Sequence, residues 1–464
     1  MARSRRLGIL VLAFLMAGCS AQAIVPRPTD PAASVPSATD TPRPTNVSSD
    51  IVYVRSNDPA YPTILVIDAH TGQTMRKLID GAVSADAAAV YWYESVSGAT
   101  KTMLHLTEIA SGKELRSFTV DGDLRPARNP RGTFSPQSGD GALTGDGRHL
   151  ALMNGAFKID GEWLTKFAVV NTESGALESS AEFRGQSTFG FVAISPDGRS
   201  VFLEQYGDGA TRLRVLDVGT AKLVDATGAG LTTTGFRSAG VLSPDGRWMY
   251  RLDAGSQATN CTSTDGPSCI PNGSPPYVVA LDLATRHAVQ VMLPNTQRSS
   301  DFEKYLLWSL ALTLDGATLY AVNPALGVID EVDARQMSLR RTGAITVART
   351  GGDALTAVAR FFLPVADAKR YLIGGALLSP DGRTLYAAAH DGLAVIDTGS
   401  LASRAVWQKT HQFDTLRLSS DGRRLYAMDN IAGKLVMIDT TTGASLGEVT
   451  LQYAPAILRI DDGR

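Results

Sequence analysis

The chain has 464 residues, with 44 Lys plus Arg against 46 Asp plus Glu and a formal net charge of −2 at pH 7. This balance, with no basic run beyond the amino terminus, argues against a nucleic acid as the main partner. The 44% hydrophobic content and 44 glycines indicate a turn-rich globular protein with enough apolar material for several packed sheets.

The amino terminus predicts export and lipid anchoring. Three arginines precede an apolar stretch at 7–16, which is too short to span a bilayer but typical of a secretory signal. The stretch ends in LMAGCS, which resembles a bacterial lipobox with Cys19 as the lipidated residue. An ordinary secretory signal cleaved nearby is the alternative. We therefore expect a lipoprotein signal peptide at 1–18 and an extracytoplasmic protein of the cell envelope, lipid-anchored to a bacterial membrane.

Residues 19–49 predict a tether. They are rich in Pro, Thr, Ser and Ala and have almost no large apolar side chains, so they cannot build a core. Repeated prolines favour an extended chain of about 3 Å per residue.

A short phrase repeats through 50–464 and predicts β-hairpins. It has a hydroxyl residue, one spacer or proline, Asp-Gly-Arg and an apolar stretch, as in SPDGRTLYAAA at Ser379. Proline presets the first turn position, Asp bonds back to its own backbone, and Gly accepts a positive φ. Further copies, some of them looser, begin at Thr144, Ser195, Ser243, Thr313 and Ser419, with a degenerate one at Ser84. The Asp recurs with the hairpin, so a structural role is favoured over calcium sites.

A second phrase, apolar residues ending in Asp and a small turn, supplies a third strand and leads to a fourth. It reads LAVIDTGS to Ser400 and LVMIDTTTG to Gly443. Four antiparallel strands per unit are typical of a propeller blade.

The sequence contains eight third-strand phrases but seven hairpin phrases, and the two ends of the chain explain the difference. The segments from Asp50 and Thr63 have the pattern of strands two and three, and the segment from Pro455 that of a first strand. We therefore predict an all-β fold: a single propeller of eight blades over 50–464, closed by N-terminal strands pairing with a C-terminal strand. Seven blades is the alternative, because the unit at 99–122 is irregular.

The units at 377–400 and 416–443 resemble YVTN-type β-propeller repeats, and their SPDG turns are similar to those of WD40-like propellers of the TolB type. The resemblance covers about 50–464 and implies the fold. It leaves function open, because such propellers include binding modules, lactonases, dehydrogenases and peptidase accessory domains.

Two further cysteines, Cys261 and Cys269, lie in one polar loop, and an even pair in an exported protein predicts a local disulfide. A metal site is the alternative, but no His lies nearby and the spacing fits no zinc pattern.

The sequence contains no phosphate-binding glycine loop, no nucleophile elbow and no paired histidines at metal-ligand spacing, so we predict no catalytic residue, metal or cofactor. Loops between second and third strands, such as that of His390, and loops into first strands, such as that of His411, share one face of a propeller. The candidate ligand site on this face consists of Gln186, Arg237, Asp301, Glu303, His390, His411, Asp414 and Tyr453. A solvated loop rim is the plainer interpretation of the same residues.

Two functions remain open. The first is a monomeric binding or scaffold module, attached to the membrane by its N-terminal lipid, for an envelope protein, peptide or glycan. The second is an enzyme similar to lactonase or quinoprotein propellers, with a site at the channel mouth.

Overall fold

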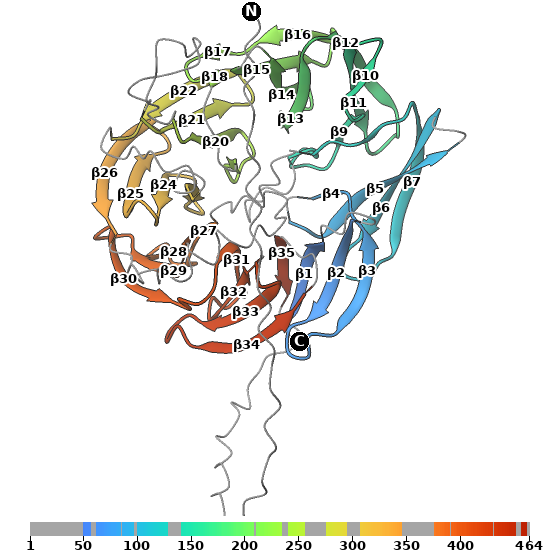
Figure 1. Ribbon diagram of the computed structural model, residues 1–464. Helices are drawn as coiled ribbons and strands as arrows, with labels where there is room; N and C mark the ends of the chain where they lie inside the picture. Colours follow the sequence, from blue (N-terminus) through green and yellow to red (C-terminus); the bar gives the residue numbers. More distant parts are fainter. Residues whose placement is uncertain are drawn as a thin grey trace, which may run out of the picture. The chain divides into compact units, whose positions relative to one another are not determined.

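The structure is a computed structural model (Figure 1) that describes residues 50–56, 62–84, 86–96, 100–128, 141–207, 210–233, 240–255, 275–294, 307–345, 375–389, 391–429, 431–451 and 456–461. The chain divides into two compact units, Met1–Asn46 and Val47–Arg464, and every described residue belongs to the second. No helix in these ranges is long and apolar enough to cross a membrane.

The described strands form eight antiparallel blades arranged in a ring, as Figure 1 shows, which confirms the predicted propeller. Blade 1 contains β4 (Ala82–Val83), β5 (Ala89–Val96), β6 (Lys101–Glu108) and β7 (Glu114–Asp121). Blade 2 contains β8 (Arg125–Pro126), β9 (His149–Met153), β11 (Glu162–Asn171) and β12 (Leu177–Gly185), with β10 (Phe157–Ile159) added to β11. Blade 3 contains β13 (Thr188–Ile194), β14 (Ser200–Gly207), β15 (Ala210–Asp217) and β16 (Lys222–Asp225), with β18 (Thr232–Thr233) paired to β15.

The other blades follow the same order from the first, inner strand to the fourth, outer strand. Blade 4 contains β19 (Val241–Leu242), β20 (Trp248–Asp253), β21 (Tyr277–Asp282) and β22 (His287–Met292), with β17 (Thr227–Gly228) parallel to β22. Blade 5 contains β23 (Ser309–Leu312), β24 (Thr318–Asn323), β25 (Val328–Asp333) and β26 (Ser338–Ala344). Blade 6 contains β27 (Ala376–Leu378), β28 (Thr384–Ala389), β29 (Gly392–Asp397) and β30 (Ala402–Trp407). Blade 7 contains β31 (Phe413–Leu418), β32 (Arg424–Asp429), β33 (Lys434–Asp439) and β34 (Ser445–Thr450).

Blade 8 closes the ring with both ends of the propeller sequence. Its inner strand is β35 (Ala456–Asp461), and its other strands are β1 (Ile51–Ser56), β2 (Thr63–Asp68) and β3 (Thr74–Ile79). β1 pairs antiparallel with β35, from Ile51 opposite Asp461 to Arg55 opposite Ala456. The predicted strand exchange is confirmed, and it hydrogen-bonds the end of the chain to its beginning.

The repeated phrase forms its turn through the side chains that define it. In blade 6, Ser379 Oγ donates to Asp381 Oδ1 at 2.6 Å, and Asp381 Oδ1 also accepts from Arg383 N at 3.0 Å. Thr384 N donates to Ser379 Oγ at 2.9 Å. Gly382 has a φ of 69°, as this tight turn requires.

Packing between blades forms the core, and blade 6 shows how one strand serves two neighbours. Leu385 and Ala387 of β28 join a buried cluster with blade 5. Tyr386 and Ala388, on the opposite face of the same strand, join a cluster with blade 7. Burial on both faces explains why second strands such as β28 carry apolar residues at consecutive positions.

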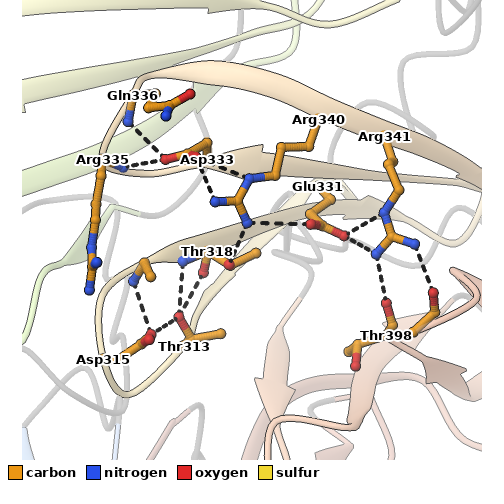
Figure 2. A network of polar contacts seen from close by, with 12 residues as sticks. Thr313, Asp315, Thr318, Glu331, Asp333, Arg335, Gln336, Arg340, Arg341 and Thr398 are labelled. Atoms are coloured by element: carbon orange, nitrogen blue, oxygen red, sulfur yellow. Dashed lines mark hydrogen bonds and ion pairs between the residues drawn. The ribbon is translucent and has the colours of Figure 1, made fainter.

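Polar contacts also join adjacent blades. Glu331 of blade 5 pairs with Arg341, whose guanidinium donates to Thr398 O and to Gly399 O of blade 6 (Figure 2). At the ring closure, Arg424 Nε of blade 7 lies 2.7 Å from Asp50 Oδ2, beside β1 of blade 8.

The two faces of the propeller carry different connections because neighbouring strands are antiparallel. The connections from first to second and from third to fourth strands lie on one face, which we call the turn face. The connections from second to third strands, and from one blade to the next, lie on the other, which we call the loop face.

Candidate functional site: the loop face

Extra chain length is concentrated on the loop face. Three connections there are long: from Asp253 at the end of β20 to Tyr277 of β21, from Met292 of β22 to Ser309 of β23, and from Ala344 of β26 to Ala376 of β27. On the turn face, by contrast, β25 ends at Asp333 and β26 begins at Ser338, and β33 ends at Asp439 and β34 begins at Ser445.

Blade 2 is a partial exception, because its inner strand is interrupted. β8 pairs with β9 through Arg125 and Pro126, and Leu143 resumes the pairing opposite Leu150. The extra residues therefore leave from within the inner strand, while Thr144 Oγ1 still donates to Asp146 Oδ1 at 2.6 Å in the usual turn.

Polar side chains mark the loop-face end of the second strands. In seven blades this position lies ten residues after the hydroxyl residue of the repeated phrase, and in blade 8 it is the last residue of β1. The residues are Ser56, Glu94, Asn154, Gln205, Asp253, Asn323 and Asp429, and blade 6 has Ala389 instead. Several of them fix the following loop: Asp253 Oδ1 accepts from Gly255 N at 2.9 Å, and Asn323 Oδ1 accepts from Leu326 N at 3.0 Å.

Blade 7 has a cluster of described side chains on this face, centred on His411. The imidazole Nδ1 lies 3.0 Å from Asp429 Oδ2 and Nε2 lies 3.3 Å from Glu448 Oε1. The ring stacks on Phe413 with centroids 5.4 Å apart, and the residue is 8% exposed. Both ring nitrogens therefore face protein carboxylates.

The cluster fastens the connection between blades 6 and 7. Asp429 Oδ1 accepts from Ile431 N at 3.1 Å and Ala432 N at 2.8 Å, so one buried carboxylate holds two loops. Gly392 N of blade 6 donates to His411 O at 2.8 Å. A hydrogen bond from Lys434 at 2.6 Å is the main cause that lowers the pKa of Glu448, and His411 adds to it.

Asp414 follows His411 at the start of β31. It is the extra residue of a β-bulge, because Phe413 pairs with Asp429 and Thr415 pairs with Met428. Burial raises the pKa of Asp414 well above its usual range, and the negative charge of Asp429 adds to the effect. This carboxyl group therefore keeps its proton to a higher pH than an exposed Asp.

The inner strand of blade 6 approaches Asp414 closely. A Cβ on Gly375 would come within 2.3 Å of Asp414 O, so only glycine fits beside this backbone. His411 and Asp414 thus lie at one junction, between blades 6 and 7.

Gln186 is exposed in the connection into blade 3, four blades away from blade 7 around the ring. The adjacent Ser187 Oγ accepts from Gln205 Nε2 at 3.1 Å, and Gln205 Oε1 accepts from Arg214 Nη1 at 3.0 Å. The structure therefore brings His411 and Asp414 together but not Gln186. The other predicted residues lie outside the described ranges: Cys19, Arg237, Cys261, Cys269, Asp301, Glu303, His390 and Tyr453.

Comparison with known proteins finds likenesses of fold. The dihydro-heme d1 dehydrogenase NirN in complex with DHE matches at 14% identity over 89% of this chain and 75% of that protein, with a TM-score of 0.49. Apo AztD from Citrobacter koseri matches at 12% identity over 89% and 98%, with a TM-score of 0.46. PpgL, the periplasmic gluconolactonase of Pseudomonas aeruginosa, matches at 16% identity over 80% and 98%, with a TM-score of 0.39.

No model of a known protein family matches the chain, and no curated protein matches it in sequence. The assignment as an eight-bladed propeller therefore rests on the strand pairing of this chain itself.

Sequence reasoning missed Asp429 and Glu448, the two partners of His411. The signal for Asp429 was available, since a polar residue recurs ten residues after the hydroxyl of the turn phrase. Glu448 gives no such signal, because its contact depends on how β34 pairs with β33. In the described part of the chain, no three His, Cys, Asp or Glu side chains are close enough to hold a metal ion.

Proposed function

We propose that this chain is a lipid-anchored, extracytoplasmic propeller whose loop face binds an envelope protein, peptide or glycan. The single observation that carries the proposal is the difference between the two faces: apart from the extra residues of blade 2, the turn face repeats short turns, whereas the connections of the loop face differ from blade to blade. Connections that vary in length on a rigid scaffold are where proteins place recognition residues.

The rigidity of the scaffold supports the same role. The β1–β35 pairing closes the ring, and the buried contacts of Asp429 and Asp253 hold the first residues of their loops in place. A binding surface that is ordered before the ligand arrives loses less conformational entropy on binding.

A lipid anchor at Cys19 would attach the propeller to a membrane through the tether. The LMAGCS sequence supplies the lipidation signal at Cys19, and 19–49 supplies the spacer. Such a chain would carry its propeller tens of ångströms from the bilayer, at about 3 Å per residue of extended tether.

Affinity capture from detergent-solubilised envelopes tests the proposal. The full lipidated chain should enrich a discrete partner, and an excess of the soluble 50–464 propeller should compete that partner away. A Cys19→Ser variant should leave the membrane fraction but still bind the partner in solution. Recovery of no partner that the soluble propeller displaces would overturn the proposal.

A further inference from the structure

A crevice of about 260 Å³ opens on the turn face between blades 4 and 5. It lies entirely within the described residues, and its lining consists of Ser243, Pro244, Asp245, Trp248, Tyr250, Asp315, Gly316, Ala334 and Arg335. Its volume is just below the roughly 300–1,000 Å³ of pockets for drug-sized ligands, so a smaller molecule fits it.

This junction lacks a hydroxyl group that some other junctions of the ring carry. Tyr91 of blade 1 is hydrogen-bonded to Thr172 of blade 2, and Tyr320 of blade 5 to Thr398 of blade 6. Tyr250 is the corresponding residue of blade 4, but the residue opposite it in blade 5 is Ala334.

Tyr250 consequently lacks a close partner. Its hydroxyl donates to Ala334 O at 3.4 Å, a long contact for a phenol that is 2% exposed. Burial, with the charge of Asp245 adding, raises the pKa of Tyr250 to about 12, so the phenol keeps its proton. A buried donor at the edge of a crevice is available to a ligand.

Two carboxylates line the crevice with one oxygen each engaged in a turn. Asp245 Oδ1 accepts from Ser243 Oγ and Arg247 N, and Asp315 Oδ1 accepts from Thr313 Oγ1 at 2.6 Å. These hydrogen bonds help to lower the pKa of both groups, so both are ionised at neutral pH. Within the described ranges neither Oδ2 accepts a hydrogen bond.

An opposite charge and an ordered aromatic ring complete the lining. Arg335 extends from blade 5 toward the turn of Asp315 (Figure 2), and its charge contributes to the lowered pKa of that residue. Trp248 is held by Arg247, whose guanidinium lies 5.6 Å from the ring centroid and 2.6 Å from Asp282 Oδ2.

These groups select the chemistry of the ligand. Asp accepts only, and Arg donates only, so the ligand must offer donors and acceptors side by side. A simple cation would meet Arg335, and a simple anion would meet two carboxylates. The vicinal hydroxyl groups of a sugar satisfy both kinds of partner, and the apolar face of its ring suits an indole.

We propose that the crevice between blades 4 and 5 binds one pyranose ring of an uncharged sugar. The site is on the opposite face from the loops, so it does not depend on the function proposed for the loop face. A chain with both sites would join a glycan to its loop-face partner.

Fluorine NMR of the full chain in detergent, labelled with 5-fluorotryptophan, tests this proposal. The chain has five tryptophans, and a Trp248→Phe variant identifies the signal of Trp248. Glucose, galactose, mannose and N-acetylglucosamine are each titrated to about 50 mM, above the millimolar Kd that so small a contact allows. At least one of them should shift the Trp248 signal with saturation.

Two variants separate the site from general effects. Ala334→Thr introduces the hydroxyl that Thr172 and Thr398 supply at two other junctions and fills the crevice, so it should weaken binding by about tenfold or more without lowering stability. Asp315→Asn should also weaken binding by about tenfold, whereas Asp381→Asn, in the equivalent turn of blade 6, should leave it unchanged. The proposal would be overturned if no sugar gave a saturable shift, or if Ala334→Thr and Asp315→Asn both bound sugar as tightly as the unmodified chain. It would also be overturned if the diamine putrescine, a simple cation, gave a saturable shift and no sugar did.

Discussion

The contact of Asp50 with blade 7 offers a quantitative test of ring closure. Asp50 is fully buried and accepts from Arg424 Nε at 2.7 Å, Arg424 Nη2 at 3.2 Å and the hydroxyl of Tyr426. Asp50→Asn keeps the shape of the side chain but removes the charge that faces a guanidinium whose side chain is 18% exposed. Removing one partner of a buried pair costs about 3–5 kcal/mol. The partial exposure of Arg424 places the expected loss near the lower end, at about 3 kcal/mol.

Equilibrium urea unfolding, followed by tryptophan fluorescence and by circular dichroism, measures this loss. Asp225→Asn is the matched control, because Asp225 also pairs with an arginine, at 3.0 Å from Arg214 Nε, but its side chain is 81% exposed. The control should lose less than about 1 kcal/mol. The double variant Asp50→Asn/Arg424→Met should recover part of the loss, since it leaves no uncompensated charge. A loss for Asp50→Asn no larger than that of the control would refute the reasoning.

Two further predictions concern ionisable side chains of the inner strand β31. Arg417 is 7% exposed and donates to Leu458 O and Leu416 O. The residues at the same position in the other blades are all apolar: Ala82, Ala142, Ala193, Val241, Ala311, Leu377 and Leu458. Burial lowers the pKa of Arg417 to about 10, so the cost of its charge is fully present below pH 10 and shrinks as the pH rises above it. Arg417→Leu should therefore stabilise the fold by about 1–3 kcal/mol at pH 7 in urea unfolding, and by less at higher pH; a destabilised variant would contradict this. Burial raises the pKa of Asp414, so ionisation of this group lowers the stability of the fold as the pH rises through that pKa. Asp414→Asn should therefore increase the free energy of unfolding by about 1–3 kcal/mol at pH 8 and change it little at pH 4. An equal effect at both pH values, measured in the same way, would show that ionisation of Asp414 is not the cause.

The sequence predicts the blades well because their signals are local. The turn at Ser379 is formed by side chains no more than five residues apart, and Asp397 at the end of the third strand accepts from Ser400 N at 2.7 Å. Even the degenerate copy in blade 1 keeps the geometry, since Ala87 takes the position of the glycine with a φ of 52°. Closure was also predictable, because the incomplete units at the two ends complement each other.

The candidate sites depend on contacts that no local pattern encodes. His411 meets Glu448 across 37 residues, through the pairing of four strands of blade 7. The turn-face crevice depends on the absence of one hydroxyl at Ala334, and this matters only because Tyr250 of the preceding blade lies opposite. Such packing between blades requires the three-dimensional register of the ring.

Site-directed photocrosslinking tests most directly the claim that the loop face binds the partner. Ile431, 59% exposed on the loop face, and Arg423, exposed on the turn face, flank the two ends of β32 in blade 7. Benzoylphenylalanine replaces each residue in turn, and the cells are irradiated. The account predicts a discrete macromolecular adduct from position 431 and none from position 423. Adducts from position 423 alone, or the same adducts from both positions, would contradict it.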